Sequence, residues 1–310
     1  MWFMGSPVSL VKVHGAPKGL KSAIAESLNL IGFTFDGSVK SVVIKPNMCY
    51  YWGPSTGHTT DPQIVSVIID LVREAYGEQV VIKIAEADAS AMRTKYVFPV
   101  LGYSKLAVEK KVELLNLSED ELVEIPLTIN GLELSFKVPQ SLVKADLFIN
   151  VPKLKVMRAT KITCAMKNIF GCIALPRKVR YHKHLEEAIV GINKILHPHL
   201  TVVDGIIALG SHPVRLDLIM ASRDAFSVDW IASELTGYAP SKVKFLNVAI
   251  KEKVGNPTGI SEKGENMKQF MKIFPKPGLA SSKYWWKIQF SMVKTYQRLS
   301  GDIVPPALED

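Results

Sequence analysis

Cysteine is scarce in this chain, which contains three in total: Cys49, Cys164 and Cys172. They form no C-x-x-C pair and cannot supply the four thiolates of an iron–sulfur cluster or of a four-cysteine zinc site. So few, widely separated cysteines also argue against a disulfide framework. The cysteine content therefore excludes the thiolate-rich metal proteins and the small disulfide-stabilised domains.

Long apolar runs are also lacking, since none approaches the ~20 residues that a membrane-spanning helix needs. The first residues, MWFMGSPVSLVKVHG, show no charged segment followed by an apolar segment and a small-residue cleavage site. Neither the phosphate-binding motif GxxxxGK[ST] nor the dinucleotide motif GxGxxG occurs. We therefore expect a cytoplasmic protein that uses neither of these nucleotide-binding motifs.

The composition is that of an ordinary soluble globular protein with a sizeable core: 310 residues, 47% hydrophobic and 22% charged. The formal net charge is +9. A basic balance of this kind favours an anionic partner, which leaves open anionic metabolites, nucleic acid and an acidic membrane surface.

Strand-like and helix-like segments alternate along the chain, which is typical of an α/β protein with right-handed crossovers. We predict a mostly parallel, doubly wound sheet with helices on both faces. Residues 1–240 form the predicted core, and residues 241–310 form a helical C-terminal extension that packs on it. Within the core, Asn130-Gly131 is a predicted two-residue hairpin turn. A strand over 199–210 is expected to end at Asp204-Gly205.

The segment 144–172 is the centre of the predicted functional site. Its first part alternates apolar and polar residues as a buried strand does, and Pro152 ends the alternation. Four cations follow at once, namely Lys153, Lys155, Arg158 and Lys161. Because ligands of α/β proteins bind where strands end, these cations indicate an anion site, with a solvated basic loop as the alternative.

The next apolar segment, ITCAMKNIFG, carries Lys167 and Asn168. A lysine within such a run must reach solvent along its own stem, form a pair, or point into a polar cavity. Lys45 and Asn47 end another predicted strand, and Glu86 ends a third. Glu86 is therefore either a general base or the structural ion-pair partner of a strand-end lysine.

Three further groups complete the candidate site. Thr59 and Thr60 stand at the start of a predicted helix that has Thr60 or Asp61 as its N-cap and Pro62 in its first turn. Helix N-termini bind anions, and helix capping alone is the alternative explanation of Thr60 and Asp61. His182 and His184 follow a basic run, and one of them is expected to face the ligand. Asp204 would bind a metal or orient a lysine, but no complete set of metal ligands is predicted.

Several motifs together resemble the DUF362 family of bacteria and archaea. They occur in the family's order and spacing over about residues 40–240: VVIKPN, HTTDP, ADLFINVPKLK, AMKNIFG, TVVDGI and ASRDAFSVDWIASELTG. The family pattern Lys-Asn-x-x-Gly is intact here, and a histidine follows it. Its Lys-x-His motif is not intact, because Met157 stands where the family has histidine.

What the resemblance implies about activity is limited, because the family is named for having no assigned function. Many members carry a cysteine-rich ferredoxin-like insert; this chain has none, so no iron–sulfur cluster is expected. The strand-end lysines are similar in style to those of lactate-racemase-like proteins, which bind a nickel pincer cofactor. Likeness of fold does not transfer chemistry, and we assign no cofactor.

Our first hypothesis is an enzyme, of isomerase or transferase type, that acts on a small carboxylate or phosphate. The catalytic candidates are Lys167, Glu86 and His182. The ligand-binding candidates are Lys45, Asn47, Thr59, Thr60, Lys153, Lys155, Asn168, His184 and Asp204. The alternative is a non-catalytic nucleic-acid-binding protein that uses its basic surface and the aromatic stretches YYWG and KYWWK. The basic, aromatic tail from residue 275 on would contact its own domain, a second copy in a homo-oligomer, or a membrane surface.

Overall fold

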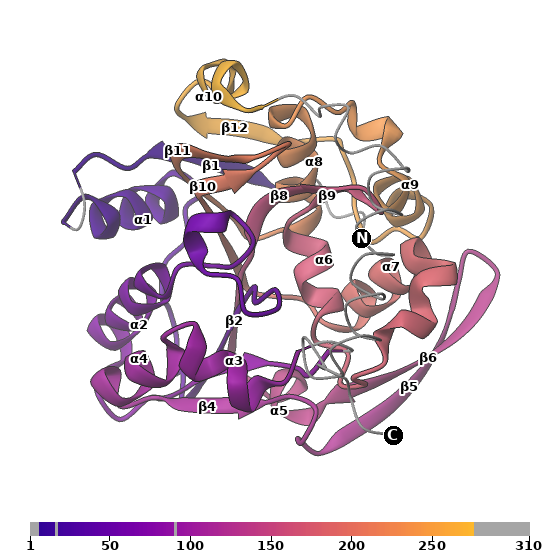
Figure 1. Cartoon of the computed structure of the whole chain (residues 1–310), viewed down its shortest axis with the longest axis horizontal. Helices are drawn as coiled ribbons and strands as arrows, with labels where there is room; N and C mark the ends of the chain where they lie inside the picture. Colours follow the sequence, from indigo (N-terminus) through magenta and orange to yellow (C-terminus); the bar gives the residue numbers. More distant parts are fainter. Residues whose placement is uncertain (1–5, 16–17, 90–91, 276–310) are drawn as a thin grey trace, which may run out of the picture.

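The computed structural model describes residues 6–15, 18–89 and 92–275. Figure 1 shows a twisted sheet at the centre of the molecule with helices on either side. The predicted basic, aromatic tail falls on residues 276–310, which lie outside the described residues.

The main sheet has the strand order β12-β1-β11-β10-β7-β2-β3-β4. Its strands are β1 (Pro7–Lys12), β2 (Ser41–Pro46), β3 (Val81–Glu86), β4 (Glu113–Asn116), β7 (Leu147–Val151), β10 (Leu200–Leu209), β11 (Pro213–Ser222) and β12 (Ser261–Gly264). Beside this path, β8 (Lys153–Met157) pairs with β10 and with β9 (Lys161–Thr163). A separate hairpin consists of β5 (Leu122–Ile129) and β6 (Leu132–Pro139).

Most neighbouring strands are parallel, including the central run β10-β7-β2-β3-β4. The strand β11 is antiparallel to both of its neighbours, β10 and β1. A three-residue connection between β10 and β11 is too short for a crossover, so these two strands must run in opposite directions. The predicted mostly parallel α/β class is confirmed, with this antiparallel part added.

Helices cover both faces of the sheet, as predicted (Figure 1). One face carries α1 (Lys18–Leu30), α2 (Pro62–Tyr76), α3 (Thr94–Val100) and α4 (Tyr103–Lys110). The other carries α5 (Gln140–Val143), α6 (Ala165–Phe170), α7 (Leu185–Ile195), α8 (Ala225–Leu235), α9 (Lys244–Lys251) and α10 (Met267–Ile273). Each set buries its apolar side chains in its own cluster against the sheet, which explains why strands such as β7 are buried along their whole length.

Local sequence signals set several boundaries. Helix α2 begins where Asp61 accepts a hydrogen bond from the N–H of Gln63, and Pro62 occupies the first turn. The β5–β6 hairpin turns at Asn130 and Gly131, whose φ angles are 52° and 80°. Two adjacent residues in the left-handed region are what a tight hairpin turn needs, so this predicted turn is confirmed.

The prediction that the strand over 199–210 ends at Asp204-Gly205 is wrong. Strand β10 continues to Leu209, with an irregularity between Gly205 and Ile207. A carboxylate is tolerated inside the strand because Asp204 lies beside Lys153 of β8 and is paired with it. Of the four cations after Pro152, Lys153 and Lys155 are buried in strand β8, Lys161 begins β9, and Arg158 is exposed in the turn between these strands, as the solvated-loop alternative expects.

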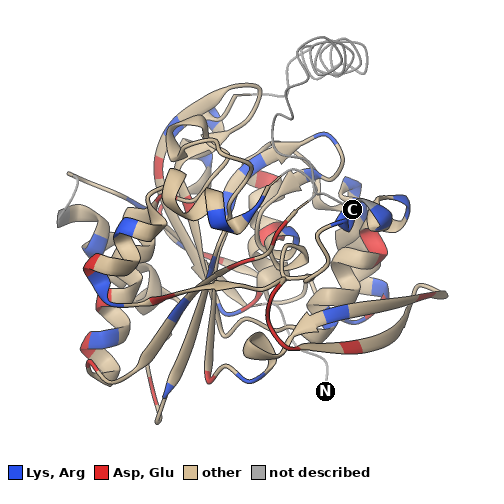
Figure 2. Cartoon of the chain, turned by 60° about the horizontal axis from the view of Figure 1, so that its bottom comes forward, with Lys and Arg blue, Asp and Glu red and all other residues tan. Residues whose placement is uncertain are grey.

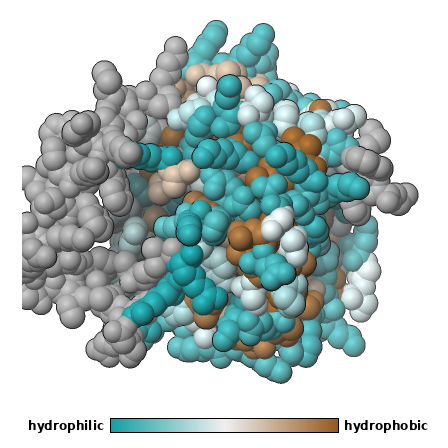
Figure 3. Space-filling model, turned by 90° about the vertical axis from the view of Figure 1, so that its right-hand side faces the viewer, coloured by the Kyte–Doolittle hydropathy of each residue, from teal (hydrophilic) through white to brown (hydrophobic). Residues whose placement is uncertain are grey.

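Residues 241–275 contribute most of a short 3₁₀ turn (Pro240–Lys242), α9, β12 and α10, and β12 is an edge strand of the main sheet. The side of the molecule shown in Figure 3 is mostly hydrophilic, with hydrophobic residues as separate spots where it is not covered in grey. In the described residues, no helix has the length and apolar character needed to cross a membrane.

Candidate functional site

The carboxyl-terminal ends of β2, β7 and β3 lie side by side because these strands are parallel neighbours. In register, Lys45 of β2 lies opposite Asn150 of β7, and Pro46 lies opposite Val151. The chain leaves β7 at Pro152 and continues at once as β8, which brings Lys153 next to β10. The topology thus gathers the predicted strand-end lysines at one edge of the sheet, and we call this the strand-end lysine site.

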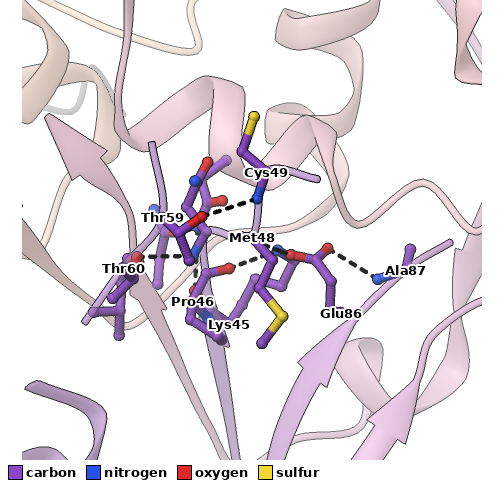
Figure 4. A network of polar contacts seen from close by, with 12 residues as sticks. Lys45, Pro46, Met48, Cys49, Thr59, Thr60, Glu86 and Ala87 are labelled. Atoms are coloured by element: carbon purple, nitrogen blue, oxygen red, sulfur yellow. Dashed lines mark hydrogen bonds and ion pairs between the residues drawn. The ribbon is translucent and has the colours of Figure 1, made fainter. Parts of the chain in front are cut away.

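Lys45 and Glu86 form a buried ion pair in this site (Figure 4), with 2.7 Å between Nζ and Oε2. The same Glu86 oxygen accepts a hydrogen bond from the Met48 N–H at 3.2 Å, and its other oxygen accepts one from the Ala87 N–H at 2.9 Å. Lys45 also donates to the carbonyl of Pro46. The carboxylate is therefore fully engaged in holding strand ends together, which corresponds to the ion-pair alternative considered from the sequence.

Lys153 and Asp204 form a second buried ion pair, with 2.8 Å between Nζ and Oδ2. Asp204 also accepts hydrogen bonds from the N–H groups of Asp61, at the start of α2, and Ile206. It thereby ties β8, β10 and α2 together. Of the two roles considered for Asp204, the structure places it beside a lysine.

Lys155 differs from these two lysines because it lies beside neutral groups. Its ammonium donates to Asn47 Oδ1 at 3.2 Å and to the carbonyl of His58 at 2.9 Å. It is 3% exposed, and within the described ranges it has no ion pair with a carboxylate. Asn47 in turn donates to the same His58 carbonyl at 2.6 Å. Lys155 is therefore a buried cation whose charge is not neutralised by direct contact.

The predicted hydroxyl ligands Thr59 and Thr60 are buried and engaged with the backbone around β2 (Figure 4). The Thr60 hydroxyl accepts from the Asn47 N–H at 3.0 Å and donates to the Val151 carbonyl at 2.8 Å. Thr59 Oγ1 accepts from the Cys49 N–H at 3.4 Å. In Figure 4 the Cys49 side chain points away from this network. Thr60 thus fixes the loop after β2 onto the end of β7, and Thr59 connects two parts of that loop.

Helix α6 supplies Lys167 and Asn168, which the sequence singled out. The Asn168 amide donates to the Lys45 carbonyl at 3.1 Å and to Asn150 Oδ1 at 2.8 Å, so it anchors the helix to β2 and β7. Lys167 is partly buried, and its Nζ lies 5.7 Å from the centre of the Phe170 ring. In the described part of the chain, its ammonium has no hydrogen bond or ion pair beyond this ring contact.

Asp229 of α8 fixes the start of α6. Its carboxylate accepts hydrogen bonds from the N–H of Ala165 at 2.6 Å and from that of Met166 at 3.0 Å. Burial raises the Asp229 pKa to about 7, against the lowering effect of these two N–H groups. Because Lys167 is the next residue after this anchor, Asp229 is a positioning residue for the site.

Burial and like charge lower the pKa values of the lysines without a carboxylate partner. Burial lowers the pKa of Lys155, and the charges of Lys153 and Lys45 act in the same direction. Burial first, and the charge of Lys155 second, lower the pKa of Lys167 to about 8. The two ammonium groups are therefore near enough to repel each other, an arrangement that an anion between them would relieve.

Lys178 belongs to the same region and was missed from the sequence, where it appeared only as part of a basic run. It lies in a 3₁₀ segment (Lys178–His184), is 8% exposed, and donates to the carbonyl of Asp88 at 2.7 Å. Burial lowers its pKa to about 8, and the charge of Lys45 contributes to this. Nothing in the local pattern RKVR distinguishes this lysine from its exposed neighbours.

The two candidate histidines end the same 3₁₀ segment. His182 is exposed, and its pKa is lowered by the partial burial of its ring and by the charge of Lys167. It therefore lies within electrostatic range of Lys167. His184 is partly buried and immediately precedes α7.

Metal-binding side chains do not gather in the strand-end lysine site. Across the described ranges, no group of three or more His, Cys, Asp or Glu residues is placed to hold a metal ion. The polar groups around Lys155 are lysine, amide and carbonyl groups, and Met157 stands where a histidine would offer a ligand. These residues do not fit the ligand set of a nickel cofactor, and we derive no chemistry through one.

A hollow of about 270 Å³ lies at the opposite end of the sheet, around the first residues of β2 and β3. Its charged side chains are Lys83, Lys144, Asp120 and Glu121. These charges balance, whereas the strand-end lysine site carries an excess of positive charge.

Comparisons with known proteins show which relatives this chain has and which fold it shares with them. A protein from Synechocystis sp. named as thylakoid-associated is 27% identical over 234 residues, which cover 70% of this chain and 69% of that protein. The fold is similar to that of the lactate racemase apoprotein from Thermoanaerobacterium thermosaccharolyticum, with a TM-score of 0.50 and 12% identity. The similarity covers 75% of this chain but spans only 57% of the racemase, and it bears on the fold alone.

The family model described as "Domain of unknown function (DUF362)" matches residues 42–234. This range runs from β2 to α8, and so includes each strand and helix that supplies a side chain to the strand-end lysine site. The chain belongs to the DUF362 family.

Proposed function

We propose that this protein binds a small carboxylate or phosphate at the strand-end lysine site and acts on it as an enzyme. The observation that carries the proposal is the pair Lys155 and Lys167, two cations at one site with no carboxylate partner among the described residues. Two cations whose charges act on each other favour a bound anion, since its charge offsets both their repulsion and their desolvation.

The lysines of the site differ in their proposed roles, because some are paired with carboxylates and others are not. Lys45 and Lys153 are already neutralised by Glu86 and Asp204, so their contribution is to fix the strand ends. Lys155 then remains to bind the anion, and Asn47 orients the anion by a hydrogen bond. The hydrogen bonds from Lys155 to Asn47 and His58 hold its ammonium in position, and the two ion pairs hold the strand ends around it, so the positive charge is oriented before an anion binds.

Lys167 is suited to proton transfer as well as to binding. With a pKa of about 8, a fraction of its side chains is neutral near physiological pH. A neutral amine beside the bound anion can take a proton from a neighbouring carbon or hydroxyl group and return it later. In this proposal His182, which is exposed and within electrostatic range of Lys167, exchanges that proton with solvent.

The alternative of nucleic-acid binding receives less support. Lys155 is buried, not laid along an open surface, and a strand of nucleic acid needs a continuous accessible groove of positive charge. In Figure 2 basic positions are interspersed with acidic ones over helices, loops and strands. A small anion is the better match to buried lysines.

A thermal-shift screen of the purified protein tests the proposal, with phosphate, small mono- and dicarboxylates, and a single-stranded oligonucleotide. We expect stabilisation by one of the small anions, and its loss in Lys155→Met and Lys167→Met. Lys167→Met removes an ammonium that has no hydrogen bond among the described residues, whereas Lys155→Met also leaves the buried Asn47 Oδ1 without its donor, so the melting temperature of each ligand-free variant is the baseline for its shift. Lys194→Met is the matched control, because Lys194 is a half-exposed lysine paired with Glu252. Stabilisation by the oligonucleotide alone would contradict the proposal.

A further inference from the structure

A cluster of three rings stands beside the strand-end lysine site, on the loop after β2. It consists of Tyr50, Trp52 and His58, and we call it the aromatic loop cluster. The ring centres of Tyr50 and Trp52 are 5.1 Å apart, and those of Trp52 and His58 are 4.4 Å apart. Tyr50 is 41% exposed and Trp52 is 47% exposed. Large apolar surface is thus left open to solvent next to a polar site.

The cluster is joined to the lysines by direct contact. The His58 carbonyl accepts the hydrogen bond from Lys155, and the His58 ring packs against Trp52. Partial burial and the charge of Lys155 lower the pKa of His58, which places its ring within range of that ammonium. Burial and the neighbouring Cys49 raise the pKa of Tyr50. The His58 ring therefore lies near the Lys155 ammonium, and Trp52 packs against that ring.

The loop constrains the position of His58 and the backbone of Tyr50. Asn47 donates to the His58 carbonyl, and the His58 Nδ1 lies 3.1 Å from the Thr56 carbonyl oxygen. Tyr50 has a φ of 52°, in the left-handed region that residues with large side chains rarely adopt. A bulky residue persists in this conformation only where its surroundings impose it, and such positions concentrate at binding sites.

We propose that the aromatic loop cluster binds a flat ring of the substrate, so that the ligand of this protein is an aromatic or heteroaromatic carboxylate or phosphate ester. The inference rests on the proposed function, because the acidic group of the same ligand is bound by Lys155 and Lys167. Exposed Trp and Tyr faces stack on planar rings, and the neighbouring ammonium groups fix the end that carries the charge. An aliphatic anion would use the lysines and leave the rings uncovered.

Isothermal titration calorimetry with two matched pairs of ligands tests this inference: phenyl phosphate against methyl phosphate, and benzoate against acetate. For at least one pair we expect the wild-type protein to bind the ring-bearing member about tenfold more tightly. Trp52→Ala should reduce that preference to about twofold or less and leave the affinity for the aliphatic member unchanged. Tyr96→Ala is the control, since Tyr96 of α3 is also 47% exposed but has a lysine, Lys95, over its ring.

The outcomes distinguish failure of this inference from failure of the proposed anion site. Binding of the aliphatic anions without any preference for a ring, or a preference that survives Trp52→Ala, overturns the inference and leaves the anion site intact. Failure of all four ligands to bind overturns both. Loss of affinity for the aliphatic member in Trp52→Ala also counts against the inference. The rings would then stabilise the positions of the lysines and would not bind the ring of the substrate.

Discussion

Replacing Glu86 by glutamine should destabilise the protein strongly, because it leaves Lys45 as an uncompensated buried cation. The two side chains are 5% and 1% exposed, and the Nζ–Oε2 distance is 2.7 Å. Removing one partner of a buried ion pair costs about 3–5 kcal/mol. Glutamine has one acceptor oxygen where the carboxylate has two, so its NH2 group must face either Lys45 and Met48 or the Ala87 N–H, all of which are donors, and we expect a loss within this range of about 3–5 kcal/mol. That is a large fraction of the ~5–15 kcal/mol by which a domain is stable.

Urea unfolding followed by circular dichroism measures this loss. The variants are Glu86→Gln, Lys45→Met and the double variant, which should lose less than the sum of the two single variants because the pair acts as a unit. Lys110→Met is the control: it breaks a pair with Asp70 that is 25% and 40% exposed, and should cost less than about 1 kcal/mol.

A Glu86→Gln protein within about 1 kcal/mol of wild type would refute the reasoning. It would mean that the carboxylate is not needed to neutralise Lys45. If such a protein also lost its activity, Glu86 would be a general base, the other role considered from the sequence. We expect the opposite result, in which Glu86→Gln lowers the free energy of unfolding because Glu86 is the ion-pair partner of Lys45.

Two further predictions concern pH. Binding of the anion found in the thermal-shift screen should weaken as the pH rises through about 8, because the Lys167 ammonium loses its charge there, and titration calorimetry of Lys167→Met should show a smaller dependence on pH. The Lys167 pKa is lower in the folded than in the unfolded chain, where it is ~10.4, so wild-type stability should also rise with pH between these values, and a flat profile would contradict the lowered pKa. The pH dependence of the stability that Asp229 contributes has the opposite sign, because the pKa of Asp229 in the folded chain, about 7, lies above its value in the unfolded chain. The stability that it contributes is lost as the pH rises from ~4 to ~7, so urea unfolding should find the Asp229→Asn protein gaining on wild type across this window, and equal slopes would contradict the assignment.

The fold class followed from the sequence because parallel strands and their covering helices leave strong local patterns. Caps and turns such as Asp61-Pro62 and Asn130-Gly131 have a local physical cause, and they were predictable for that reason. The continuation of β10 past Asp204 was not predictable, because a buried charge inside a strand depends on a partner that is 51 residues away in sequence.

The candidate site was predictable as a set of lysines and not as a set of roles. Strand-end position identified Lys45, Lys153 and Lys155 alike, but which of them is neutralised depends on the neighbouring strands and loops. Lys178 has no pattern of its own, and its burial comes from tertiary contacts around Asp88. The position of a lysine along a strand thus predicts that it lies at the end of the sheet, whereas the order of the strands decides whether a carboxylate pairs with it.

The central claim is that Lys155 and Lys167 together bind a small anion. Titration calorimetry of the anion found in the thermal-shift screen, with wild type, Lys155→Met, Lys167→Met and Lys194→Met, tests it most directly. We predict that each site variant weakens binding at least about tenfold, as expected for the loss of a charged contact, while Lys194→Met binds like wild type. Equal affinities in all four proteins would show that the anion binds elsewhere, and would contradict the claim.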